Sequence, residues 1–173
     1  MALAYLASLS YNQAGALQGE EKVKKLDEAR DWNMKLIEAD PKNKEAYYSI
    51  GVIAWSKWYP ALGKARAELG MKPEDPGPIK DKKVKEELKT SYGAIVDEGI
   101  TNLQKALEVD PEYDDAMAYM NLLIREKADL ADSADENKKQ VEVADNWVQK
   151  ALDTKKKKAA RQPGNLGITQ EAK

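Results

Sequence analysis

The chain has 173 residues, enough for one domain with a buried core, and its 28 basic and 30 acidic residues leave a net charge of −2. This balance lacks the large positive patch that nucleic-acid binding requires. The sequence contains no cysteine and no histidine, which excludes disulfides, thiolate metal sites, cysteine nucleophiles and the commonest general base. No apolar run approaches the roughly 20 residues that span a bilayer.

The N-terminal stretch MALAYLASLSYNQAG is predicted to be a helix rather than a signal peptide. It lacks the basic residues that open a signal peptide, and Leu3, Leu6 and Ser10 share one helical face. No N-cap residue precedes this helix, as would be the case in a chain shortened at its N-terminus. The sequence leaves open whether the N-terminus is native or processed.

Two segments of the chain end with the same residue pair, Asp-Pro. The segment EARDWNMKLIEADP ends at Pro41, and DEGITNLQKALEVDP ends at Pro111. Proline ends a helix because its ring clashes with the preceding turn. When the two prolines are aligned, Ala29 matches Gly99, and small residues of this kind let another helix come close. A weaker third copy, VEVADNWVQKALDTK, has Ala144 at this position but no closing proline.

The residues after each Asp-Pro pair also repeat. In KNKEAYYSIGVIAW and EYDDAMAYMNLLIR, matching residues recur at i, i+3, i+4 and i+7, which is one helical stripe. These residues are Tyr47, Ile50, Gly51 and Ala54 in the first segment and Met117, Met120, Asn121 and Ile124 in the second. Together with the Asp-Pro segments, they resemble the tetratricopeptide repeat, whose pattern is W-x2-L-G-x2-Y, then A-x3-F, then A-x4-P. The match is good at Tyr47, Ile50, Gly51, Ala106 and Pro111, and also at Ala29 and Pro41.

This resemblance covers roughly two thirds of the chain and implies an all-α fold, a right-handed solenoid of about three antiparallel helix pairs. The pairs would lie at approximately 2–39, 44–109 and 112–158, within a solenoid 1–158. A polar tail, 159–173, has little to build a core with and is expected to be extended. The alternative from the residues alone is an irregular helical bundle with ordinary Asp-Pro stops.

The repeats are longer than those of the family, whose period is about 34 residues. Pro41 and Pro111 lie 70 residues apart, and we expect the excess to form an insertion, 59–81, in the middle pair. Pro60 would start a short helix and Gly70 would cap it before a Pro-rich loop. The expected elements are helices 2–14, 20–39, 44–58, 60–69, 82–109, 112–131 and 134–158, and a loop 70–80.

The sequence offers little for catalysis, and we expect no enzyme, no metal site and no cofactor. It has no G-x-S-x-G motif, no P-loop and no G-x-G-x-x-G motif. Carboxylate pairs such as Asp114 and Asp115 are usually solvated helix surface. The run Lys155–Lys158 suits the last turn of a helix, whose dipole favours positive charge, and a polyanion or an anionic membrane surface is the alternative.

In proteins of the tetratricopeptide family, the first helices of successive pairs line a concave groove. Aromatic residues flanked by charges would suit peptide capture there. The family's basic clamp for acidic C-terminal peptides is missing, since Arg125 stands alone. Packing of Trp55 and Trp58 against the insertion is the alternative. Carried over by position, the groove residues are Glu45, Tyr48, Ser49, Val52, Trp55, Asp115, Ala118, Tyr119, Leu122 and Arg125, with Tyr5, Ser8 and Tyr11 as further candidates.

Two functions follow, and both are non-catalytic protein–protein interaction. The first is a scaffold that assembles head to tail into a filament through open solenoid ends. The alternative is a monomeric adaptor that binds a peptide or protein in the groove. The partner is therefore the chain itself or another protein, and the family resemblance loosely favours a bacterial cell envelope or extracellular location over the cytoplasm. The residues expected at the end-to-end contact are Leu3, Leu6, Leu9, Val143, Trp147 and Val148.

Overall fold

The computed structural model describes residues 2–72 and 74–161. These residues form helices and connecting turns without a strand, which confirms the all-α class. None of these helices has an apolar stretch long enough to cross a membrane. The helices are α1 (Ala2–Gly15), α2 (Gly19–Ala39), α3 (Lys44–Glu68), α4 (Lys82–Val109), α5 (Asp114–Lys127) and α6 (Ala134–Arg161), with a 3-10 turn at Ala128–Leu130 between the last two.

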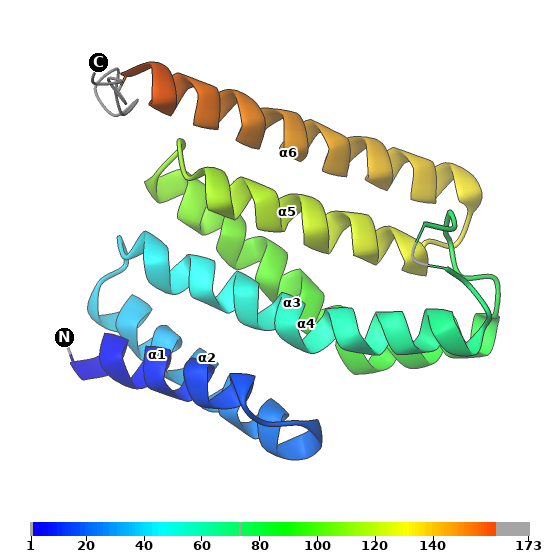
Figure 1. The fold of residues 1–173 in the computed structure, drawn as a ribbon, viewed down its shortest axis with the longest axis horizontal. Helices are drawn as coiled ribbons and strands as arrows, with labels where there is room; N and C mark the ends of the chain where they lie inside the picture. The colour runs from blue at the N-terminus through cyan, green and yellow to red at the C-terminus, as the bar shows by residue number, and fades with distance from the viewer. Residues whose placement is uncertain (1, 73, 162–173) are drawn as a thin grey trace, which may run out of the picture.

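Consecutive helices pair into antiparallel hairpins, which stack in chain order (Figure 1). Helix α1 packs on α2, α3 on α4, and α5 on α6. Between hairpins, α2 contacts α3, α4 contacts α5, and α3 also contacts α5. Each hairpin therefore covers a face that its neighbour could not bury by itself, which is how stacked helical repeats are stabilised.

The two Asp-Pro junctions have the same local structure. Asp40 ends α2 and its Oδ1 accepts a hydrogen bond from the backbone N–H of Lys42 at 3.0 Å. Asp110 ends α4 and accepts in the same way from Glu112 at 2.9 Å. An aspartate that bonds the backbone two residues on forms a tight turn, and the intervening proline prevents the helix from continuing. The sequence repeat is thus a repeated turn between hairpins.

The middle hairpin is held by a very close approach of α3 and α4. Gly51 on α3 and Gly99 on α4 face each other across the crossing, and both are buried. A Cβ atom on Gly99 would lie 2.5 Å from the Cβ of Ala54 and 2.9 Å from a methyl group of Leu123 on α5. Since real carbon atoms do not come that close, glycine is required here for three helices to meet.

We predict that Gly99→Ala lowers the free energy of unfolding by about 1–3 kcal/mol, because the new methyl group overpacks the crossing. Gly93→Ala is the matched control on the same helix. Nothing lies within 4 Å of a Cβ there, so alanine should stabilise α4 by about 0.5–1 kcal/mol. Urea denaturation followed by circular dichroism measures both. Equal effects of the two substitutions would contradict the close crossing.

The helix break predicted at residue 59 is wrong. Residues 44–68 form the single helix α3, with Pro60 inside it. Pro60 is exposed, so the carbonyl that its ring frees, that of Ser56, can bind water instead. On the opposite side, Trp58 is 0% exposed and Leu62 is 3% exposed. Burial of these side chains keeps the helix together where its local sequence favours a break.

The Pro-rich loop between α3 and α4 is fastened to the rest of the protein. Arg66, near the end of α3, donates to Asp129 Oδ2 at 2.6 Å and to the carbonyls of Lys72 and Asp75 in the loop. The backbone N–H of Ile79 donates to the carbonyl of Asp129 at 2.9 Å, and the Ile79 side chain is 1% exposed. These bonds hold the loop against the tip of the middle hairpin.

Other boundaries differ by a few residues. The helix predicted at 112–131 begins at Asp114, because Pro111 and the turn after it precede it, and it tightens into the 3-10 turn at Ala128. The helix predicted to end at 158 continues to Arg161, whose guanidinium bonds Glu112 at 2.6 Å and 2.8 Å. The rest of the predicted tail lies outside the described residues.

Candidate functional site

Aromatic side chains form a continuous surface across α3 and the start of α5. The ring of Tyr48 lies 5.0 Å from that of Tyr113 and 5.5 Å from that of Tyr119, between ring centroids. Tyr119 is 5.9 Å from Trp55 in an edge-to-face arrangement, and Trp55 stacks on Tyr59 at 4.9 Å. Such ring pairs stabilise each other beyond the area that they bury. We call these five residues the aromatic wall.

Helical periodicity explains the wall. Tyr48, Trp55 and Tyr59 recur at i, i+7 and i+11 along α3, so they lie on one side of the helix. The opposite side carries residues of the core, such as Ile50, which is 1% exposed. Tyr59 keeps 49% of its surface exposed, and Tyr48, Trp55 and Tyr119 are half-buried. The wall is thus the outer edge of the core. Tyr113, at 8% exposure, is its buried member, and the other four rings are partly exposed to solvent.

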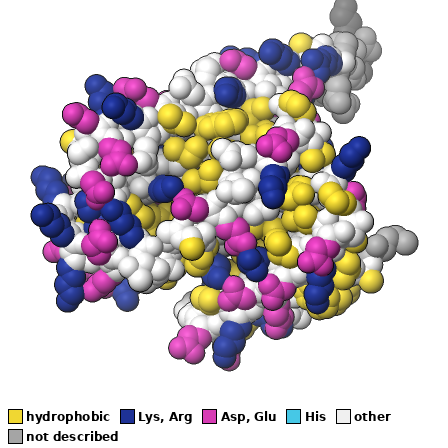
Figure 2. All heavy atoms as spheres, turned by 180° about the vertical axis from the view of Figure 1, so that it is seen from behind, with side chains coloured by type: hydrophobic (Ala, Val, Ile, Leu, Met, Phe, Trp, Pro, Cys, Tyr) yellow, Lys and Arg dark blue, Asp and Glu magenta, His cyan; other side chains and the backbone are white. Residues whose placement is uncertain are grey.

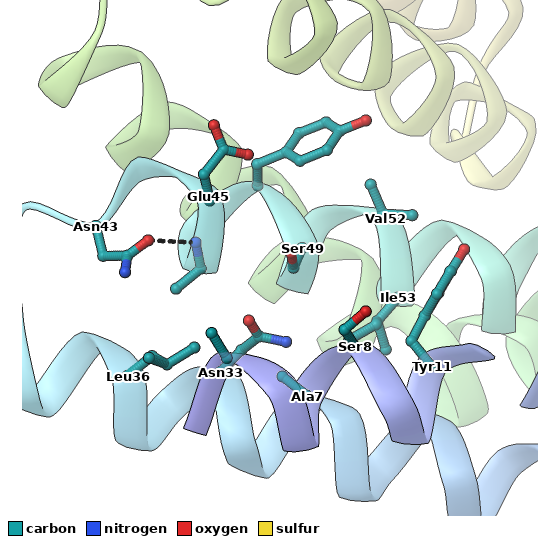
Figure 3. Close-up of a pocket in the computed structure, with 13 residues that line it drawn as sticks. Ala7, Ser8, Tyr11, Asn33, Leu36, Asn43, Glu45, Ser49, Val52 and Ile53 are labelled. Atoms are coloured by element: carbon teal, nitrogen blue, oxygen red, sulfur yellow. Dashed lines mark hydrogen bonds between the residues drawn. The ribbon is translucent and has the colours of Figure 1, made fainter. Parts of the chain in front are cut away.

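A hollow of about 560 Å³ opens beside the wall, between α1, α2 and α3. In Figure 3, Ser8 and Tyr11 on α1 point toward Val52 and Ile53 on α3. The side of α1 that borders the hollow carries small residues, and these do not fill the space up to α3. The residues around the hollow are Ala4, Ala7, Ser8, Tyr11, Asn33, Leu36, Asn43, Glu45, Ala46, Tyr48, Ser49, Val52 and Ile53.

The structure brings together most of the residues predicted for the groove. Tyr48, Trp55 and Tyr119 belong to the wall, while Glu45, Ser49 and Val52 line the hollow beside it together with Ser8 and Tyr11. Trp58, by contrast, is 0% exposed and belongs to the core. Leu122 and Ala118 are half-buried, Asp115 is exposed, and Tyr5 is 68% exposed.

Arg125 does not turn toward the wall. Its guanidinium bonds Asp145 on α6 and the side-chain oxygen of Asn121. The position of Arg125 on α5 corresponds to that of Trp55 on α3, so the two hairpins present different chemistry at matching places.

Sequence reasoning missed Tyr59, Tyr113 and Glu126. Tyr113 is the residue before α5, the position that Asn43 occupies before α3, where the asparagine side chain caps the helix. The sequence signal for Tyr113 was a tyrosine at a position where a helix-capping residue is expected. For Tyr59 the signal was its position four residues after Trp55, hidden by the assumed break at Pro60.

Burial raises the pKa of the phenols of Tyr48, Tyr113 and Tyr119, and nearby carboxylates add to the effect. The hydroxyl of Tyr113 donates to Glu45 Oε2 at 2.6 Å. Burial raises the pKa of Tyr48, and the neighbouring Tyr119 and the negative charge of Asp115 raise it further. Burial likewise raises the pKa of Tyr119, with Tyr11 and Asp115 adding to it. The raised pKa keeps Tyr48, Tyr113 and Tyr119 as O–H donors.

Glu126 on α5 lies behind the wall. Its Oε1 accepts a hydrogen bond from the indole N–H of Trp55 at 2.9 Å, whereas its buried Oε2 has no hydrogen-bond partner among the described residues. Burial raises the pKa of this carboxyl to about 7, and the charge of Asp129 contributes, although the bond from Trp55 acts in the opposite direction. The carboxyl thus changes its charge near neutral pH.

We predict that the charge on Glu126 destabilises the fold as the pH rises. Its folded pKa of about 7 exceeds the ordinary 4.5, so the folded protein binds more protons between these values and loses stability over that window. Glu126→Gln keeps an acceptor for Trp55 and should raise the free energy of unfolding at pH 8 by about 2 kcal/mol, with little gain at pH 4.

Urea denaturation of both proteins at pH 4 and pH 8 measures this difference. Glu142→Gln, an exposed position on α6, is the control and should change little at either pH. The prediction fails if wild type and Glu126→Gln respond to pH in the same way.

The residues predicted for the end-to-end contact lie on α1 and α6. Leu3 and Leu6 are half-buried and Leu9 is 37% exposed. On α6, Val143 is 47% exposed and Val148 is half-buried, whereas Trp147 packs against the main core. From behind, acidic and basic side chains intermingle over the surface, with apolar areas between them (Figure 2).

Within the described residues, no group of three or more acidic side chains could hold a metal ion. No model of a known protein family matches the chain, and neither does any curated protein.

Proposed function

We propose that this chain is a non-catalytic interaction scaffold of the tetratricopeptide type, which binds a polypeptide segment along the face that α1, α3 and α5 share. The order of the stacked hairpins, the repeated Asp-Pro turn and the small residues at the helix crossing support the family assignment. The observation that carries the binding role is the continuity of the aromatic wall with the hollow beside α1.

A polypeptide is the class of ligand that this surface fits best. The wall offers half-exposed rings, which bury much area with little loss of side-chain entropy. The hollow adds hydroxyl groups from Ser8, Ser49 and Tyr11, which can bond a peptide backbone or polar side chains. Apolar and hydrogen-bonding groups side by side match an extended peptide segment with alternating side chains.

Selection from a random 12-residue peptide display library tests the proposal. We expect groove-binding peptides whose affinity falls at least about tenfold for Ser8→Arg, since a long charged side chain would fill the hollow beside the wall. Asn12→Arg, an exposed position on the same helix outside the hollow, is the matched control and should bind normally. Equal binding to both variants, or no selected peptide, would contradict a peptide groove.

Head-to-tail assembly is the second candidate, favoured by the composition of α1. This helix carries no charged side chain and exposes Tyr5 by 68% and Leu9 by 37%. The last helix, α6, exposes Val143 and Leu152 by 47% and 48%. If α6 of one copy packed on α1 of the next, as α4 packs on α5 within the chain, the contact would be head-to-tail. Such a contact need not close, and a filament then grows.

We predict for this candidate that light scattering increases with protein concentration and that negative-stain microscopy shows regular fibres. Tyr5→Glu and Val143→Glu should each abolish growth, because they bury a charge in the contact while leaving the core intact. Asn12→Glu, exposed on α1, shows whether any added charge has this effect. A monomer at every concentration would eliminate assembly and leave the groove as the interaction surface.

A further inference from the structure

Beside the aromatic wall, the basic side chains have ion-pair partners, whereas one acidic side chain has none among the described residues. The basic groups that flank it are already paired, since Lys44 Nζ lies 2.6 Å from Asp110 Oδ2 and Arg125 bonds Asp145. Asp115 is exposed and forms no ion pair or hydrogen bond within residues 2–72 and 74–161. The uncompensated charge at the wall is thus negative.

Glu45 adds to this negative charge. Its side chain is exposed and accepts a hydrogen bond from the neutral phenol of Tyr113, which leaves its charge in place. Asp115 stands at the position on α5 that Glu45 has on α3, so the repeat places a carboxylate in the first turn of both helices. These two carboxylates lie at the end of the wall where Tyr48 and Tyr113 meet.

The rings can hold a cation as well as apolar groups. The face of an aromatic ring attracts positive charge when a cation lies within about 6 Å of its centre. The protein uses this attraction internally, because Lys44 Nζ lies 4.8 Å from the centre of the Tyr113 ring. The phenol of Tyr11 lies farther along α3, where its oxygen is 3.3 Å from Ser56 Oγ. The rings of Tyr48 and Tyr113 and the carboxylates of Glu45 and Asp115 therefore lie together at one end of the wall.

We propose that the wall and the carboxylates of Glu45 and Asp115 bind an arginine side chain of the partner polypeptide. The inference rests on the proposed function and specifies the partner's chemistry. A guanidinium is planar, so it can stack on a ring while its N–H groups donate to a carboxylate in the same plane. An acidic segment would meet two like charges here, with the nearby basic groups already paired.

The test compares Ac-Leu-Arg-Leu-amide with the same peptide containing citrulline, which has nearly the same shape but no charge. Binding to the full chain is followed by the indole N–H signals of the four tryptophans in NMR spectra. The arginine peptide should shift Trp55 and leave Trp147, on the far side, unchanged. The citrulline peptide should bind about tenfold more weakly, because it loses the attraction to the rings and carboxylates.

Substitutions then test whether the carboxylate of Asp115 binds the arginine side chain. Asp115→Asn should weaken the arginine peptide about threefold, as expected for an exposed charge, without changing the citrulline peptide. Asp135→Asn, an exposed aspartate in the first turn of α6, is the matched control and should have no effect.

Equal affinity for the two peptides would overturn the arginine site while leaving a peptide groove, and so would groove-dependent library peptides without basic residues. Absence of any shift at Trp55 would also overturn it. Whether the groove binds a peptide at all is tested separately, by comparing Ser8→Arg with Asn12→Arg.

Discussion

The rest of the structure depends on the contact between α3 and α4 at Gly51 and Gly99. There is no room for a side chain at either position of this crossing, so the two helices approach more closely than larger residues would allow. The contact fixes the rotation of α3 about its own axis. Residues such as Ile50 then enter the core, and Tyr48 and Trp55 remain on the opposite edge. The aromatic wall is therefore a consequence of how tightly the middle hairpin closes.

The first hairpin is attached differently, and that difference makes the hollow. Its buried contact with the second hairpin is a small cluster of Ala14, Leu26, Ala29 and Ile53, apart from the large core around α3, α4 and α5. Small residues on α1 leave space in front of α3, where a larger side chain would have filled it. The closely packed middle hairpin thus carries the aromatic wall, and the less closely packed first hairpin leaves the hollow open beside it.

The Pro-rich loop shows that an irregular sequence can be firmly held. Arg66 and Asp129 form a buried ion pair whose remaining hydrogen-bonding groups are met by loop carbonyls and by Ile79. Gly77 lies directly against this pair, where a Cβ would be 2.1 Å from Asp129 Oδ1. Separating such a pair leaves an uncompensated buried charge, so the loop ties the tip of the middle hairpin to the tip of the last one.

The sequence by itself determined the helices, the Asp-Pro turns and the aromatic stripe, because periodicity, proline and side-chain capping act within a few residues. The resemblance to the tetratricopeptide repeat predicted Tyr48, Trp55 and Tyr119 for one surface. Only the tertiary structure decided that α3 continues through Pro60, that Arg125 bonds α6, that Tyr113 joins the wall and that Glu126 lies behind it. These outcomes depend on burial and pairing between residues far apart in the chain. Local helix propensity does not predict such contacts.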